Sequence, residues 1–159
     1  DELAALRRLA AALALLVRDR GEYRFAFQHL IYPMIDDRTC VTPDPHPYVG
    51  EFVWTPEANV FGWTSLLGHA PGGEGVSPYA AAARAENLSG LPPTFLATGA
   101  LDLFLDENLD YASRLVRAGV PVEMHVYPGA FHAFQWSPGA RVSRDAARDS
   151  REALARALT

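Results

Sequence analysis

The feature that most constrains the fold is a regular alternation of helical and strand patterns along the 159 residues. In chain order the patterns predict a helix at 2–20, a strand at 24–34, a helix at 57–67, a strand at 94–99, a helix at 105–118, a strand at 121–127 and a helix at 138–158. Strands that alternate with helices pair in parallel through right-handed crossovers. The sequence therefore predicts one α/β domain built on a parallel sheet.

The individual patterns are clear enough to predict which faces are buried. Apolar residues recur at spacings of three and four in the first helix, where Gly21 supplies the stop. The residues expected to face inward on the three helices at 2–20, 57–67 and 105–118 are Leu6, Leu9, Leu13, Leu16, Val17, Val60, Trp63, Leu67, Leu109, Leu115 and Val116. Dense aromatic and branched residues indicate the strand at 24–34, and Pro33 is expected to end it.

Composition excludes several classes of protein. The net charge is −5 and the basic residues are scattered, which argues against nucleic-acid binding. The single cysteine, Cys40, excludes a disulfide framework and a cysteine-rich zinc site. The longest apolar run, Leu9 to Val17, is too short to span a bilayer. No signal peptide is visible, so cytoplasmic residence is expected.

Two polar residues follow strands at the positions where parallel α/β sheets carry their functional groups. Asp102 comes just after the strand at 94–99, and His132 comes just after the strand at 121–127. If these strands are neighbours, the two side chains reach the same edge of the sheet. An acid in that place fixes the tautomer of a catalytic histidine.

Less specific interpretations of these residues remain open. Asp102 could simply begin a loop, and His132 could be packed between neighbouring aromatic residues. Asp106 is expected to cap the following helix, with Asp110 in its first turn. The other histidines, His29, His46, His69 and His125, show no local pairing, so no metal site is expected.

The segment 35–83 is expected to be a loop-rich insertion that contains the short helix at 57–67. It carries several prolines before that helix and a glycine-rich stretch, Gly72-Gly73-x-Gly75, after it. No strand precedes the glycines, so they indicate a surface turn and not a phosphate-binding loop. The irregular residues 35–56 form a long loop for a compact domain, and such loops are usually functional or act as lids.

Three ordered segments resemble the C-terminal half of an α/β-hydrolase of the hormone-sensitive-lipase-like carboxylesterase family. Phe27 to Asp36 resembles the strand after the nucleophile helix, Leu91 to Asp102 with Asp106-Glu107 resembles the acid segment, and Ala118 to His132 resembles the histidine segment. The acid and histidine segments together span 91–135. The resemblance implies that Asp102 is the triad acid, that His132 is the triad base, that the substrate is a short-acyl carboxylic ester and that no cofactor takes part. If it holds, a carboxylate oxygen of Asp102 should lie about 2.6–3.2 Å from the His132 ring.

The chain departs from this family in its first eight residues, an atypical N-terminal segment. The family carries a nucleophile elbow and a His-Gly-Gly-Gly oxyanion motif, and neither is present here. The serine of the elbow would fall near Ala4 or Ala5, and neither Ser77 nor Ser89 has the glycine framing of an elbow. We therefore expect acid and base without a nucleophile, and no activity from this chain alone. A binding or association module, or a different acid–base enzyme completed by a partner chain, is the alternative.

The missing upstream strand also predicts association. In the family fold the strand at 24–34 would pair with the strand that leads into the elbow. Without it, Phe25, Phe27, Leu30 and Ile31 would lie along an uncovered edge, which is a template for pairing with another chain. By resemblance, the strand at 121–127 can serve as a dimer edge. We expect a homodimer or another edge association, unless the helix at 2–20 seals the edge.

Overall fold

The computed structural model describes the backbone of residues 2–159 and the side chains from residue 10 onward. Its elements are α1 (Glu2–Arg20), β1 (Gln28–Ile31), α2 (Pro56–Leu67), the 3-10 helix η1 (Ala82–Arg84), β2 (Thr94–Gly99), α3 (Leu105–Arg117), β3 (Val122–Tyr127), the 3-10 helix η2 (Phe134–Trp136) and α4 (Arg141–Ala157). The predicted alternation of helices and strands is confirmed. Asp1 and the side chains of Leu6 and Leu9 lie outside the described set.

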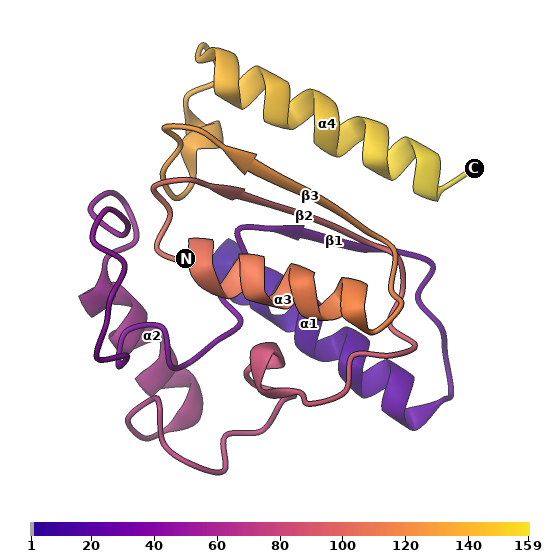
Figure 1. The fold of residues 1–159 in the computed structure, drawn as a ribbon, viewed down its shortest axis with the longest axis horizontal. Coiled ribbons are helices and arrows are strands. Elements are labelled where there is room, and N and C mark those ends of the chain that lie inside the picture. Colours follow the sequence, from indigo (N-terminus) through magenta and orange to yellow (C-terminus); the bar gives the residue numbers. More distant parts are fainter. Residues whose placement is uncertain (1) are drawn as a thin grey trace.

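The strands of the described chain form a parallel sheet in the order β1-β2-β3. Helices α1 and α3 cover one face of this sheet and α4 covers the other (Figure 1). Helix α2 lies beyond the end toward which the strands point. Because the strands are parallel, their carboxyl ends meet at one edge of the sheet, next to the loops that follow each strand.

A separate apolar core lies on each face of the sheet. On the face toward α1 and α3, Leu15 and Leu115 pack with Leu30 and Leu96 of the strands. On the face toward α4, the core includes Phe95, Ala97, Tyr127, Ala146 and Ala153. Alanines at the helix contacts let α1 and α4 approach the sheet closely, which fixes the two layers relative to the strands.

Strand β1 is much shorter than the predicted strand at 24–34. Pairing with β2 begins where the Gln28 N–H donates to the Pro93 carbonyl, at 2.9 Å. The residues before Thr94 are Pro92 and Pro93, which have no N–H to extend the ladder. At the other end, Tyr32 has a positive φ of 36° and precedes Pro33, so the extended backbone stops there.

Three helices bury different faces from those predicted. In α1, Leu13 is 45% exposed, and Leu15 is buried in its place. In α3, Leu109 and Val116 are exposed, Val116 at 60%, while Asn108, Tyr111 and Leu115 are buried. In α2, Asn59 and Trp63 are buried and Val60 is at the surface. In α2 and α3 the apolar pattern predicts the wrong face because asparagines occupy buried positions: Asn108 Nδ2 donates to the Pro33 carbonyl at 2.8 Å, and Asn59 Oδ1 accepts from the Trp54 indole at 3.2 Å.

A buried ion pair ties the long segment after β1 to the rest of the chain. Asp37, which is fully buried, accepts from the Arg84 guanidinium at 2.7 and 2.8 Å and from the Gly72 N–H at 2.7 Å. Burial alone would raise the pKa of Asp37, but the hydrogen bonds from Arg84 and Gly72 outweigh it and hold that pKa below its usual value.

Within residues 2–159, no helix is long and apolar enough to cross a membrane.

Candidate acid–base site

The carboxyl ends of β2 and β3 bring Asp102 and His132 together. His132 Nδ1 lies 3.1 Å from Asp102 Oδ2 and 3.3 Å from Oδ1. Asp102 is fully buried and His132 is 6% exposed. The predicted separation is therefore confirmed. A proton on Nδ1 that is donated to the carboxylate leaves Nε2 as the basic nitrogen.

The loop after β2 holds the Asp102 carboxylate in place. Asp102 Oδ1 accepts the Phe104 N–H at 3.0 Å, and the Asp102 N–H donates to the Gly99 carbonyl at 3.1 Å. A Cβ atom on Gly99 would lie 2.2 Å from the Ala130 carbonyl oxygen. Glycine at this position thus lets the end of β2 approach the histidine loop closely enough for the acid–base contact.

Aromatic rings surround the imidazole of His132. The ring centroids of Tyr32, Phe104 and Trp54 lie 4.6, 5.4 and 5.7 Å from the His132 centroid. These rings come from the end of β1, the loop before α3 and the segment before α2. With the loop after β3 that carries His132 itself, the site is therefore assembled from four parts of the chain, and the sequence patterns pointed only to the loops after β2 and β3.

The predicted capping role of Asp106 is wrong. The N-cap of α3 is Phe104, which makes no side-chain cap, and Asp106 lies one residue inside the helix in its first turn. Asp110 lies beyond that turn. The acidic charge of Asp106 still faces the positive end of the helix dipole, and it is Asp102 whose carboxylate receives an N–H just before the helix begins.

The other histidines and the candidate serines have different partners. His29 Nε2 lies 2.9 Å from Ser150 Oγ, and His125 Nε2 lies 2.9 Å from Glu123 Oε1. Ser77 Oγ accepts the Tyr79 N–H, and His132 makes no hydrogen bond to Ser77 or Ser89. Over the described residues, no group of three or more His, Cys, Asp and Glu side chains could hold a metal ion.

Sequence reasoning missed the structural part played by Glu107. Its carboxylate accepts the N–H of Ile35 at 2.6 Å, the N–H of Asp36 at 3.2 Å and the hydroxyl of Thr39. Burial raises the pKa of Glu107 well above its ordinary value, although these hydrogen bonds act in the opposite direction. A carboxylate buried in the first turn of a helix gives no periodic signal, so only its place beside Asp106 in the acid segment marked it.

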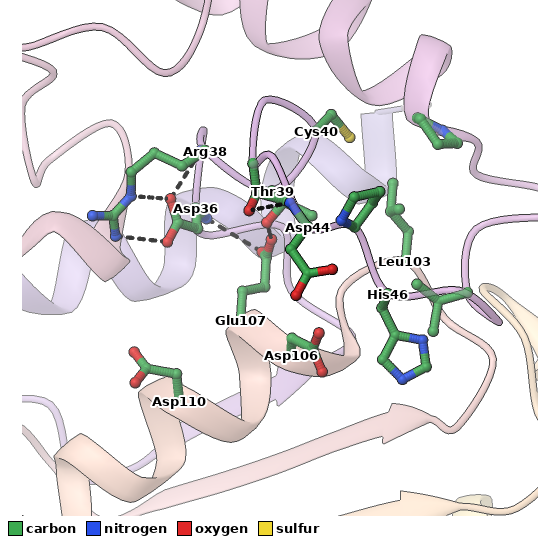
Figure 2. Close-up of a pocket in the computed structure, with 14 residues that line it drawn as sticks. Asp36, Arg38, Thr39, Cys40, Asp44, His46, Leu103, Asp106, Glu107 and Asp110 are labelled. Carbon is green, nitrogen blue, oxygen red and sulfur yellow. Dashed lines mark hydrogen bonds and ion pairs between the residues drawn. The ribbon is translucent and has the colours of Figure 1, made fainter.

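A cavity of about 590 Å³ lies between the segment after β1 and the start of α3. Figure 2 shows the acidic groups that line it, among them Asp36, Asp44, Asp106, Glu107 and Asp110. Arg38, also at its wall, is paired with Asp36 at 2.7 Å. Asp102 and His132 do not line this cavity, although Leu103 does, so the cavity lies behind the acid loop.

Comparison with known proteins finds similarity to the alpha/beta hydrolase fold and to esterases. A family model of the alpha/beta hydrolase fold matches residues 8–136. Esterase LipI of Mycobacterium tuberculosis is 31% identical over 129 residues, which are 79% of this chain and 39% of LipI. A bacterial heroin esterase superposes with a TM-score of 0.87 at 39% identity, over 96% of this chain and 49% of that chain. Esterase LipW from Mycobacterium marinum does so with a TM-score of 0.80 at 35% identity, over 96% and 47%.

This chain belongs to the α/β-hydrolase fold family, and the fold class expected from the sequence is confirmed. An esterase from the bacterial hormone-sensitive lipase family shares the fold with a TM-score of 0.78 at 24% identity. The chain spans about half the length of these solved structures and 39% of LipI.

Proposed function

We propose that this chain forms the part of a carboxylic-ester hydrolase that supplies the catalytic acid, Asp102, and the catalytic base, His132. The observation that carries the proposal is the buried contact of 3.1 Å between Asp102 Oδ2 and His132 Nδ1 at the ends of neighbouring parallel strands. The relatives with the highest similarity described above are esterases. A short-acyl carboxylic ester is the proposed substrate.

In the proposed reaction His132 transfers protons and Asp102 keeps its negative charge. Nε2 of His132 accepts the proton of the attacking serine hydroxyl as the oxygen bonds to the ester carbonyl carbon. The resulting imidazolium donates that proton to the leaving alkoxide when the C–O bond of the ester breaks. Asp102 holds Nδ1 and stabilises the imidazolium. Water then repeats both steps on the acyl-enzyme.

We place the nucleophile of this reaction outside these 159 residues. The sequence contains no Gly-x-Ser-x-Gly, and Ala4 and Ala5, where the family's serine would fall, belong to α1. A nucleophile elbow needs a tight strand-to-helix turn. The proposal therefore requires an N-terminal half, on the same or another polypeptide, to supply the serine and the oxyanion donors. The absence of an elbow keeps a second candidate open, a non-catalytic association module.

Ester hydrolysis by two proteins tests the proposal. The first is the purified chain, from which we expect no release of p-nitrophenol from p-nitrophenyl acetate above that of His132→Ala. The second is a chimera in which the N-terminal half of the bacterial heroin esterase precedes this chain. We expect the chimera to hydrolyse the ester, and His132→Ala to abolish that activity. If the chimera folds but shows no ester hydrolysis that depends on His132, the hydrolase proposal fails and the association module remains as the candidate function.

A covalent acyl adduct on the isolated chain would contradict the proposed origin of the nucleophile. Mass spectrometry after reaction with the ester would map such an adduct to Ser77, Ser89 or another residue. The matched control is the same chain with that residue changed to alanine, which should lose both the adduct and the hydrolysis.

A further inference from the structure

We infer that Tyr32 is a positioning residue for His132, one that holds the imidazole in the orientation that meets Asp102. Tyr32 directly follows β1 and is only 2% exposed. Its ring centroid lies 4.6 Å from that of His132, with an angle of 64° between the ring planes. This edge-type contact is the shortest of the three aromatic contacts around the imidazole.

Tyr32 is itself fixed at both ends. Its N–H donates to the Ala97 carbonyl of β2 at 2.6 Å, and its hydroxyl donates to Gln135 Oε1, also at 2.6 Å. Gln135 lies three residues after His132, so the hydroxyl links the end of β1 directly to the histidine loop. Phe104 and Trp54 lack this link, because phenylalanine has no polar group and the Trp54 indole donates to Asn59.

The backbone of Tyr32 is strained in a way that serves this contact. Its φ of 36° is positive, which is rare for a bulky side chain, and a proline follows it. Such conformations persist where the surroundings over-determine them, and they cluster at functional sites. Here the strained residue ends β1 and aims its ring at the imidazole rather than along the strand.

A single hydrogen bond to Nδ1 leaves the imidazole free to pivot about its contact with Asp102. The Tyr32 ring, packed against the imidazole, prevents this rotation, because other orientations of the imidazole would collide with the Tyr32 ring. Asp102 thus sets the tautomer of His132, and Tyr32 limits its rotation. The value of this arrangement for ester hydrolysis rests on the proposed function, but the orientation of the ring does not.

Nuclear magnetic resonance of the isolated chain tests the inference without any ester. The probe is the Nδ1 proton of His132 in protein labelled with ¹⁵N-histidine, identified by its disappearance in His132→Gln. In Tyr32→Phe the ring remains but its link to Gln135 is lost. We expect the Nδ1 proton of this variant to exchange with water about three- to tenfold faster, the range given by one ordinary hydrogen bond.

Gln135→Leu and a distant tyrosine supply the matched variants. Gln135→Leu should raise the exchange rate as Tyr32→Phe does, and the double variant should not exceed either single change, because both remove the same bond. Tyr79→Phe removes a tyrosine hydroxyl that donates to Asp19 at 2.8 Å on the surface, and it should leave the rate unchanged. Equal rates in Tyr32→Phe and the parent would overturn the inference.

A merely structural role would give a different pattern. In that case Tyr32→Phe would lower the melting temperature while the His132 resonance kept its shift and exchange rate. In the chimera, we expect Tyr32→Phe to lower kcat with KM little changed. Should the chimera be inactive even with Tyr32, the proposed function fails, and the exchange measurement still decides the role of Tyr32.

Discussion

Asp102 acts on two groups at once, since one oxygen accepts from Phe104 and both lie near the His132 ring. In Asp102→Asn the remaining oxygen can keep the Phe104 N–H, but the new NH₂ group opposes the Nδ1 proton. The imidazole then carries its proton on Nε2, so its basic nitrogen is Nδ1, which faces the asparagine and cannot accept the proton of the serine. We expect the activity of the chimera to fall by about three to four orders of magnitude.

The control for this prediction is the melting temperature of the same variant. Because Asn keeps the shape of Asp and its bond to the backbone, thermal unfolding should change little. A large loss of stability in Asp102→Asn, with a proportionate loss of activity, would show that the carboxylate holds the loop rather than the histidine.

Glu107 tests how a buried carboxyl supports the segment after β1. Its pKa is raised, so the folded state holds the proton more tightly than the unfolded state does. The free energy of unfolding contributed by this group is therefore greatest below about pH 4.3, the unfolded value, and declines as the pH rises through the folded pKa. Glutamine accepts the same backbone N–H groups without the charge.

We therefore expect Glu107→Gln to be at least as stable as the parent at pH 7. Glu107→Ala leaves the Ile35 and Asp36 N–H groups without their acceptor and should cost about 2–4 kcal/mol. Urea unfolding at pH 5 and pH 7 measures both variants. If Glu107→Gln and Glu107→Ala lost the same free energy of unfolding at pH 7, the ionised carboxylate, and not a hydrogen-bond acceptor alone, would be what stabilises the fold.

At the scale of elements, the Asp37–Arg84 pair joins the segment after β1 to η1. The pKa of Asp37 is lowered, so its contribution to stability is complete above the unfolded value of about 3.9 and is lost as the pH falls through the lower folded pKa. Removing one partner of a buried pair is costly, and Asp37→Ala should destabilise the chain by about 3–5 kcal/mol at pH 7.

Acid unfolding followed by circular dichroism checks whether stability is lost as the pH falls. Between pH 5 and pH 2 the parent should lose the stability that ionised Asp37 contributes. Asp37→Asn lacks this contribution at every pH, so its free energy of unfolding should depend less on pH over this range. Arg38→Gln is the matched control, because its ion pair with Asp36 is more exposed to water. An equally steep decline in Asp37→Asn would assign the acid transition to other carboxylates.

A strand that is bounded by prolines and a glycine could be predicted from the sequence. Strand β2 has the predicted bounds, and all six of its residues are buried. The start of β1 could not be predicted, because it depends on where the prolines of another segment stop the ladder, whereas its own Pro33 marked its end. The buried faces of α2 and α3 were missed for a related reason: Asn59 and Asn108 look exposed until their distant partners are known.

The same distinction applies to the acid–base site. Asp102 and His132 could be found because the carboxyl ends of parallel strands share an edge, a rule that needs no side-chain detail. Tyr32 and Trp54 reach His132 through a strained turn and a long irregular segment. No periodic pattern in the sequence marks such contacts, so only the folded chain displays them.

For the whole molecule, the outer edge of β1 is the feature with the largest consequence. Gln28 and Tyr32 donate their N–H groups to the β2 side. Because these groups alternate along a strand, that of Ile31 points toward the outer edge, along which no strand of the described chain pairs. Helix α1 lies against one face of the sheet (Figure 1), where Ala11, Ala14 and Leu15 share a core with Leu30. An uncovered strand edge is a template for another strand.

We therefore predict that the isolated chain associates at micromolar concentration, through the β1 edge, with a second copy. Multi-angle light scattering should give a mass above the 17.4 kDa of one chain. Phe25→Lys places a charge just before β1 at a residue that is 41% exposed, and it should shift the population toward the monomer. The matched control is Phe61→Lys on α2, where the parent residue is 74% exposed. If Phe61→Lys alone gives the monomer, association runs through the apolar surface of α2; if the parent is already a monodisperse monomer with a cooperative thermal transition, the half-length fold is stable without a partner at its edge.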